Sequence, residues 1–367
     1  MPPANPLLRL TQLGQSVWYD YITRDLLSSG ELERLIQDDG LRGMTSNPTI
    51  FEKAIAGSQL YDEDIRRMSE AGLCPGEIFE RLAVRDVQAA CDAFRPLYGE
   101  TGERDGFVSL EVSPQLANDT DATRKDAERL WRALSRPNAM IKIPGTQAGL
   151  AAITSSIAAG INVNVTLLFS VQRYAEVIEA YLQGLELRME RGLPIGALSS
   201  VASFFVSRVD GKVDPLLSET DRGLRGKIAI ANAARAYQLF RDSLTTERWA
   251  PLKRAGAMPQ RPLWASTSTK DPVYPDVYYV EALIAPDTVN TIPPETLEAY
   301  RDHGAPAARI DEAIDAAPGQ LTALAQAGID LEAVTRELEQ EGVSKFAASH
   351  ASVLSGIEAK AGTLATR

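Results

Sequence analysis

The sequence predicts an α/β fold, a (β/α)8 (TIM) barrel with additional helices. Its 367 residues suit either two average domains or one large barrel, and 44% apolar residues are enough to form a large core. Short β-like runs alternate with longer helix-periodic segments eight times, as this barrel requires. We predict strands at 16–22, 41–47, 107–112, 138–144, 161–166, 198–206, 262–267 and 287–292.

Two helical additions enlarge the predicted barrel, and we expect a single domain over residues 1–367. Residues 48–100, between the second and third strands, indicate several helices, and residues 305–367 indicate a helical cap. A doubly wound open sheet is the alternative architecture. That fold normally carries a glycine-rich phosphate turn after its first strand, whereas residues 18–30 contain no GxGxxG motif, so the barrel is favoured.

Charge and composition exclude several classes of function. The formal net charge of -11, from 38 basic and 49 acidic side chains, argues against nucleic acid or an anionic membrane surface as the main partner. Cys74 and Cys91 form no CxxC pair, the amino terminus does not resemble a signal peptide, and no apolar run could span a bilayer. We therefore expect a cytoplasmic protein. With only His303 and His350, a histidine metal site or a Ser-His-Asp triad is nearly excluded.

Several predicted strands alternate between apolar and polar side chains, although strands of a parallel sheet are normally apolar on both faces. If the apolar faces meet the outer helices, the polar side chains converge on the barrel interior near the carboxyl ends of the strands, where barrel enzymes place catalysis. An antiparallel sheet with one wet face is the alternative, but it is hard to arrange for strands separated by helices. The converging residues are Asp20, Asn47, Glu111, Lys142, Asn164 and Thr166.

Lys142 is the most reactive group in this set. A lone lysine in a strand is most often an edge residue whose amine reaches water. Here it lies between Ile141 and Ile143, and Pro144 ends the strand, which places the lysine at the barrel mouth. Burial disfavours an ammonium ion, so a lysine in this position can present a free amine that attacks a ketone carbonyl.

Five motifs of the chain resemble those of the transaldolase family in order and spacing, and the helical additions are similar to its long bacterial form. The motifs are TSNPTIFEKAI (45–55), VSLEVSPQLA (108–117), IKIPGT (141–146), INVNVTLLFS (161–170) and SFFVSRVD (203–210). The resemblance, which runs from about residue 14 to the last helices, implies a class I, metal-independent transferase of the pentose phosphate pathway. Such an enzyme moves a dihydroxyacetone unit from sedoheptulose 7-phosphate to glyceraldehyde 3-phosphate, giving erythrose 4-phosphate and fructose 6-phosphate. It uses no cofactor, acts on sugar phosphates, and is a monomer or a homodimer.

The resemblance also implies catalytic roles for four residues. Lys142 matches the lysine that forms a Schiff base with the donor ketose. Asp20 matches the general acid/base that takes the proton of the C4 hydroxyl during cleavage. Glu111 and Thr166 match residues that orient a catalytic water.

Further residues match groups that bind the substrate. Asn47, Asn164 and Ser203 correspond to groups that hold hydroxyls of the dihydroxyacetone unit, and Phe205 lies in the same site. The Asn47-Pro48 pair could instead serve only as a turn and helix N-cap. Fructose 6-phosphate aldolases of the same superfamily are the nearest functional alternative, and Phe205 and Glu111 argue against it. A non-catalytic sugar-phosphate-binding barrel is a second alternative, which an intact Lys142 argues against.

The phosphate site departs from the family pattern. Arg208 matches the phosphate-binding arginine and Ser266 a serine after the seventh strand. Ser268, however, occupies the place of a second arginine, and we expect Lys270 to supply the missing charge. The alternatives are that Arg208 forms a surface salt bridge and that Lys270 is a solvated loop residue. Asp20 could likewise form a buried ion pair with the lysine at the barrel mouth and take no part in chemistry.

Overall fold

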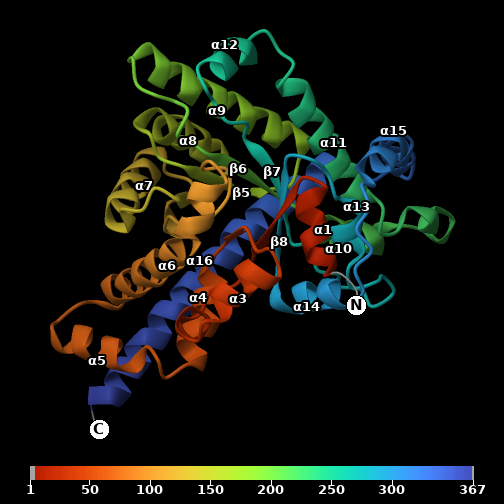
Figure 1. Cartoon of the computed structure of the whole chain (residues 1–367). Helices are drawn as coiled ribbons and strands as arrows, with labels where there is room; N and C mark the ends of the chain where they lie inside the picture. Colours follow the sequence, from red (N-terminus) through yellow and green to blue (C-terminus); the bar gives the residue numbers. More distant parts are fainter. Residues whose placement is uncertain (1–4, 366–367) are drawn as a thin grey trace.

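The computed structural model describes residues 5–365. Within these residues, eight parallel strands form a closed barrel in sequence order, with β8 paired to β1 (Figure 1), which confirms the predicted fold class. The strands are β1 Gln15–Tyr19, β2 Gly43–Met44, β3 Phe107–Glu111, β4 Ala139–Pro144, β5 Val163–Leu168, β6 Ser200–Phe205, β7 Arg261–Ala265 and β8 Thr288–Ile292.

Helices connect the strands and cover the outside of the barrel. Several begin at a polar side chain that accepts a hydrogen bond from the first turn, as Thr146 does for α8 and Ser170 for α9. The helices are α1 Pro6–Gln12, α2 Arg24–Ser28, α3 Glu31–Asp38, α4 Pro48–Gly57, α5 Asp62–Glu70, α6 Pro75–Glu100, α7 Thr120–Leu134, α8 Gln147–Ala159, α9 Val171–Glu190, α10 Ser207–Val213, α11 Ile228–Ser243, α12 Trp249–Arg254, α13 Tyr278–Ala282, α14 Pro294–His303, α15 Ile310–Gln326 and α16 Leu331–Ala365. Three 3-10 helices, η1 Pro114–Leu116, η2 Asp214–Leu216 and η3 Glu219–Leu224, complete the described elements.

The second strand is much shorter than predicted. Only Gly43 and Met44 pair as a strand, whereas the prediction covered 41–47. A Cβ atom on Gly43 would lie 2.6 Å from the Trp18 ring and 2.7 Å from the Phe107 carbonyl oxygen, so this position requires glycine. Close contact with a large ring, which the propensity of a short segment does not reveal, therefore determines the residue type at position 43.

The long helix α16 connects the barrel mouth to the helices that follow β2. Near its start, Gly342 packs so closely on Leu167 that a Cβ atom would lie 2.9 Å from that side chain. Near its end, Lys360 forms an ion pair with Asp62 of α5 at 2.7 Å. Figure 1 shows α16 running diagonally from the barrel to a lobe formed with α4, α5 and α6, where the chain ends.

The predicted additions contain the helices just described. Helices α4, α5 and α6 fall within 48–100, and α15 and α16 fall within 305–367. Residues 1–4 and 366–367 lie outside the described residues, and the assignment of 1–367 to one domain stays a prediction.

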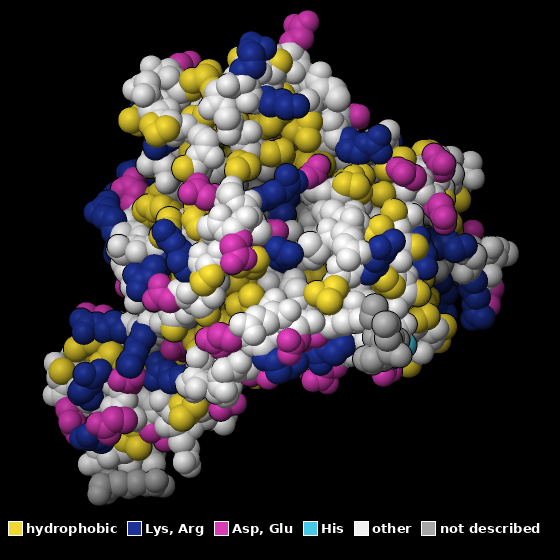
Figure 2. All heavy atoms as spheres, in the orientation of Figure 1, with side chains coloured by type: hydrophobic (Ala, Val, Ile, Leu, Met, Phe, Trp, Pro, Cys, Tyr) yellow, Lys and Arg dark blue, Asp and Glu magenta, His cyan; other side chains and the backbone are white. Residues whose placement is uncertain are grey.

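Charged side chains of both signs are intermixed on the face shown in Figure 2. Many of them pair along one helix, as Arg66 does with Glu63 and Glu70 of α5. None of the helices in residues 5–365 combines the length and hydropathy that a bilayer span requires.

Candidate active site

A cavity of about 380 Å³ opens at the carboxyl ends of the strands, and we call it the mouth cavity. Among the predicted site residues, Asp20, Asn47, Lys142, Thr166, Ser203, Phe205, Arg208, Ser266 and Lys270 all line it. Glu111 lines a neighbouring cavity instead, and Asn164 lines neither of the two. The barrel therefore gathers most of the predicted site in one place, as expected for strands whose carboxyl ends meet at one rim.

Lys142 is buried in the middle of this site, with 4% of its surface exposed. Its Nζ atom donates a hydrogen bond to the carbonyl oxygen of Ser46 at 3.2 Å and forms an ion pair with Glu111 at 3.7 Å. The ring of Phe346, from α16, lies 5.6 Å from the same nitrogen. Lys142 is thus not an edge residue that reaches water, and the corresponding alternative is wrong.

Asp20 follows β1 directly and is fixed at both its backbone and its side chain. Its backbone N–H donates to the Ile292 carbonyl at 3.0 Å, and its carboxylate accepts a hydrogen bond from the Thr45 hydroxyl at 2.7 Å. Burial raises the pKa of Asp20, although the charge of Lys142 opposes the shift. In residues 5–365, the ion pair of the Lys142 Nζ atom is with the Glu111 carboxylate. The alternative of an ion pair between Asp20 and Lys142 is therefore not observed.

Glu111 stands opposite Lys142 in the pairing of β3 with β4. Its side chain is 3% exposed, and in the described part of the chain neither carboxylate oxygen has a hydrogen-bond partner. Burial raises its pKa to about 7, against the influence of Lys142. The hydroxyl of Thr166, also buried, has no partner among the described residues either. Both groups can therefore hydrogen-bond a water or a substrate oxygen.

Asn164 is fully buried and is held from both ends of its amide. Its Nδ2 donates to the Ser109 hydroxyl at 2.9 Å, and its Oδ1 accepts from the Ser203 hydroxyl at 2.7 Å. The sequence correctly placed Asn164 on the interior face. Asn164 accepts the hydrogen bond of the Ser203 hydroxyl, and it is not among the residues that line the mouth cavity.

Asn47 occupies the start of α4, where its Oδ1 accepts a hydrogen bond from the Ile50 N–H at 3.0 Å. The N-cap interpretation is therefore correct, and Pro48 follows at the first helical position as expected. Because Asn47 also lines the mouth cavity, its remaining Nδ2 group is the one available to a ligand.

Arg208 provides the cationic end of the cavity. Its guanidinium carbon lies 5.0 Å from the Phe205 ring, and burial lowers its pKa. Within residues 5–365 it has no carboxylate oxygen within 4.0 Å, so it does not form the surface salt bridge considered as an alternative. An unpaired, largely buried arginine is available to a phosphate.

The loop after β7 adds two further groups. Ser266 has a left-handed backbone (φ 56°), and its hydroxyl lies 3.0 Å from that of Ser207. Lys270 is exposed and donates to the Ser268 hydroxyl at 2.8 Å. Lys270 nevertheless lines the mouth cavity, and its replacement of the family's second arginine stays a prediction.

Phe346 and Lys53 are among the residues lining the mouth cavity that were not predicted from the sequence. Phe346 belongs to a helix whose position over the barrel no local pattern indicates. Lys53 lies within the motif at 45–55, but six residues after Asn47, a spacing that does not place the two on one face of a helix, so helical periodicity does not indicate it.

Comparison with known proteins shows the family to which the chain belongs. The model of the transaldolase/fructose-6-phosphate aldolase family matches residues 17–357. A "Transaldolase 2" of Nostoc sp. is 47% identical over 371 residues, covering 97% of both chains. Proteins named "Transaldolase" from Frankia alni (47% over 368 residues, 99% of both chains) and Acidothermus cellulolyticus (48% over 349 residues, 94% of both chains) are similar along nearly the same span. With matches of this extent, the chain belongs to the transaldolase/fructose-6-phosphate aldolase family.

Proposed function

We propose that this protein is a transaldolase of the pentose phosphate pathway that forms a Schiff base on Lys142. It transfers a dihydroxyacetone unit from sedoheptulose 7-phosphate to glyceraldehyde 3-phosphate, giving erythrose 4-phosphate and fructose 6-phosphate. The observation that carries the proposal is a buried Lys142 amine 3.7 Å from a carboxylate, in a cavity that also presents Asp20 and Arg208. The names of the relatives support the same activity.

The first half of the reaction would proceed as follows. The Lys142 amine attacks the C2 carbonyl of the ketose, and the resulting carbinolamine loses water to give an imine. Glu111 and Thr166, with their unpartnered oxygens, would hold the water that carries protons in this step. The protonated imine then accepts the electron pair of the C3–C4 bond as Asp20 takes the C4 hydroxyl proton, which leaves an enamine and releases an aldose.

The second half reverses these steps with another aldose. The enamine attacks the acceptor aldehyde, Asp20 returns the proton to the new hydroxyl, and water hydrolyses the imine. Until the acceptor arrives, the enamine must be protected from protonation. Phe346 and Phe205, which both line the cavity, would exclude water from its carbon, while Ser203 and Asn47 hold its hydroxyls.

The charge distribution supports sugar phosphates as substrates. Among the described residues, the mouth cavity is lined by four basic side chains, Lys53, Lys142, Arg208 and Lys270, against two acidic ones, Asp20 and Glu295, in a chain of net charge -11. Because the protonated imine accepts the electron pair, the proposed reaction is metal-independent and needs no cofactor. A cytoplasmic location and an assembly state of one or two subunits remain predictions, as does the absence of nucleic acid and membrane partners.

Two experiments test this function. Incubation with fructose 6-phosphate and erythrose 4-phosphate should produce sedoheptulose 7-phosphate, and omission of the acceptor should not release free dihydroxyacetone at a comparable rate. Rapid release without acceptor would identify an aldolase instead. Borohydride added with fructose 6-phosphate should fix a dihydroxyacetone-derived adduct on Lys142, detected by peptide mass spectrometry. An adduct on another lysine, with activity retained in Lys142→Ala, would contradict the mechanism.

A further inference from the structure

A second cavity of about 230 Å³, which we call the side cavity, adjoins the site at Glu111. Its apolar lining comes mainly from α4, α6 and the end of β3 with the residues that follow it, whereas α7 adds Asp126 and Arg129 and α16 adds His350. Glu111 lines this cavity, yet its Oε2 lies 3.7 Å from the Nζ of Lys142, which lines the mouth cavity. The Glu111 carboxylate therefore lies between the two cavities, whose linings also share Asn47.

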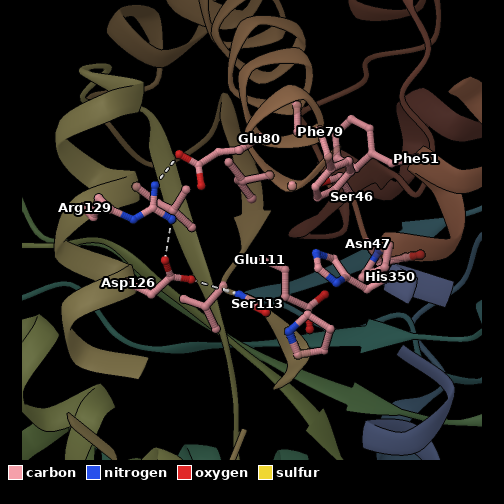
Figure 3. Close-up of a pocket in the computed structure, with 17 residues that line it drawn as sticks. Ser46, Asn47, Phe51, Phe79, Glu80, Glu111, Ser113, Asp126, Arg129 and His350 are labelled. Atoms are coloured by element: carbon pink, nitrogen blue, oxygen red, sulfur yellow. Dashed lines mark hydrogen bonds and ion pairs between the residues drawn. The ribbon is translucent and has the colours of Figure 1, made fainter. Parts of the chain in front are cut away.

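His350, on α16, supplies a titratable group to the wall of the side cavity. Its Nδ1 atom is buried and has no hydrogen-bond partner in residues 5–365, and its ring packs edge-on against Phe79 with 5.4 Å between centroids. Figure 3 shows the His350 imidazole and the Glu111 carboxylate on the same side of the cavity. The ion pairs of Arg129 lie at the other side. His350 lines the side cavity and is only half-buried, so part of the residue is also accessible from the surface.

The proposed reaction requires exchange with solvent at this point. Each imine formed releases one water, and each imine hydrolysed consumes one. Glu111 must also regain every proton that it gives to the departing oxygen. When a sugar phosphate fills the mouth cavity and Phe346 covers Lys142, the mouth is an obstructed route for both water and protons.

We propose that the side cavity is the route by which water and protons reach Glu111, with His350 as the group that exchanges protons with solvent. This inference rests on the proposed Schiff-base chemistry. In imine formation, the C2–O bond breaks as C2=N forms, and the oxygen leaves as water with a proton delivered from Glu111. His350 then reprotonates the carboxylate through water and takes its own proton from solvent. Imine hydrolysis runs the same relay in reverse, so no proton is created or lost.

The charges around the two groups suit this exchange near neutral pH. Burial raises the pKa of Glu111 to about 7, opposed by Lys142 and reinforced slightly by Asp20. Burial lowers the pKa of His350, opposed by the charge of Asp126. The remaining charged groups that line the cavity are Glu80 and Arg129, which pair with each other. His350 is thus a positioning and relay residue that acts through Glu111 and does not touch the substrate.

The test uses the full-length enzyme in water enriched in ¹⁸O. Imine formation and hydrolysis replace the C2 oxygen of fructose 6-phosphate, so mass spectrometry measures the exchange without any acceptor. We expect His350→Gln and His350→Ala to slow this exchange about 10-fold at saturating substrate, within the usual range for a proton-transfer group, with KM unchanged. Added imidazole should restore His350→Ala but not His350→Gln.

Two further variants separate the relay from a packing role. Ser349 lies next to His350 on α16, and Ser349→Ala removes only its hydrogen bond to Thr49 of α4. This variant should exchange the C2 oxygen at the wild-type rate. Ala83→Leu, which narrows the side cavity and leaves His350 in place, should slow exchange. Wild-type exchange in both His350 variants would overturn the inference, as would a loss that imidazole does not restore. The transfer assay with acceptor is separate, so an enzyme that exchanges oxygen but transfers nothing would contradict the proposed function alone.

Discussion

The Phe346 ring lies 5.6 Å from the Nζ of Lys142, although the two residues belong to the last helix of the chain and the fourth strand of the barrel. Helix α16 is held in this position from several sides. Lys212 of α10 binds Glu337 and Glu341, and Gly342 packs on Leu167. The end of the chain therefore forms one wall of the candidate active site.

We predict that Phe346→Leu increases the loss of the enamine to water. The smaller side chain opens space over Lys142, so release of free dihydroxyacetone from fructose 6-phosphate without acceptor should rise about 10-fold relative to transfer. A 10-fold change corresponds to about 1.4 kcal/mol in the difference between the activation free energies of release and of transfer. Phe94→Leu is the matched control, because Phe94 is fully buried in α6 and lines neither cavity. An unchanged ratio in Phe346→Leu, measured by coupled assays of both products, would mean that other groups exclude the water.

Asp20→Asn should separate imine formation from cleavage. The variant keeps Lys142 and its carboxylate partner, so borohydride should still fix the whole ketose on the lysine. Cleavage should fall by about 10²–10⁴-fold, the usual contribution of a general acid/base. Thr45→Val, which removes only the hydrogen bond to the Asp20 carboxylate, should cost much less. Cleavage by Asp20→Asn at the wild-type rate would mean that Asp20 is not the general acid/base, and Glu111 would become the candidate.

The interior polar pattern was predictable because it follows from strand periodicity. Side chains of a strand alternate between two faces, so Lys142 and Glu111 could be assigned to the interior without knowledge of the barrel's register. Their direct opposition across β3 and β4 depends on that register, which the sequence does not state. For the same reason the pattern places Asn164 on the interior face but does not show that its amide bonds to Ser109 and Ser203.

The residues contributed by α16 could not be predicted. Phe346 and His350 reach their positions because a helix packs across the barrel mouth, and that packing depends on contacts between segments far apart in the sequence. His350 was singled out only to exclude a metal site. A position fixed by tertiary packing leaves no periodic pattern in the local sequence.

Glu111→Gln should change how stability depends on pH. The folded-state pKa is raised from 4.5 to about 7, so the folded protein retains a proton that the unfolded chain has already lost. The contribution of Glu111 to the free energy of unfolding is therefore fully present below pH 4.5 and is lost as pH rises to about 7. The glutamine variant avoids the loss and should be more stable than wild type at pH 8 by up to about 3 kcal/mol, with no gain at pH 4. Urea unfolding at both pH values measures this, and an equal difference at the two values would contradict it.

The final prediction concerns recognition of the phosphate by Arg208 and Lys270. Arg208 is largely buried and has no carboxylate partner within residues 5–365, and its planar guanidinium can bind phosphate through two hydrogen bonds. Lys270 is exposed and offers a flexible point charge. Arg208→Ala should therefore cost about 1.5–3 kcal/mol, roughly 10- to 150-fold in kcat/KM, for phosphorylated substrates.

Lys270→Ala should cost less than Arg208→Ala, and its effect should decrease as salt rises, because an exposed charge is better screened than a buried one. The measurement is kcat/KM for erythrose 4-phosphate and for unphosphorylated erythrose in both variants, at low and high ionic strength. Lys253→Ala, on the exposed surface of α12, controls for the general loss of one positive charge. Equal losses on the two acceptors in Arg208→Ala would show that the arginine supports the structure of the site and not phosphate binding. A salt-independent loss in Lys270→Ala would show that this lysine makes a direct, desolvated contact with the phosphate.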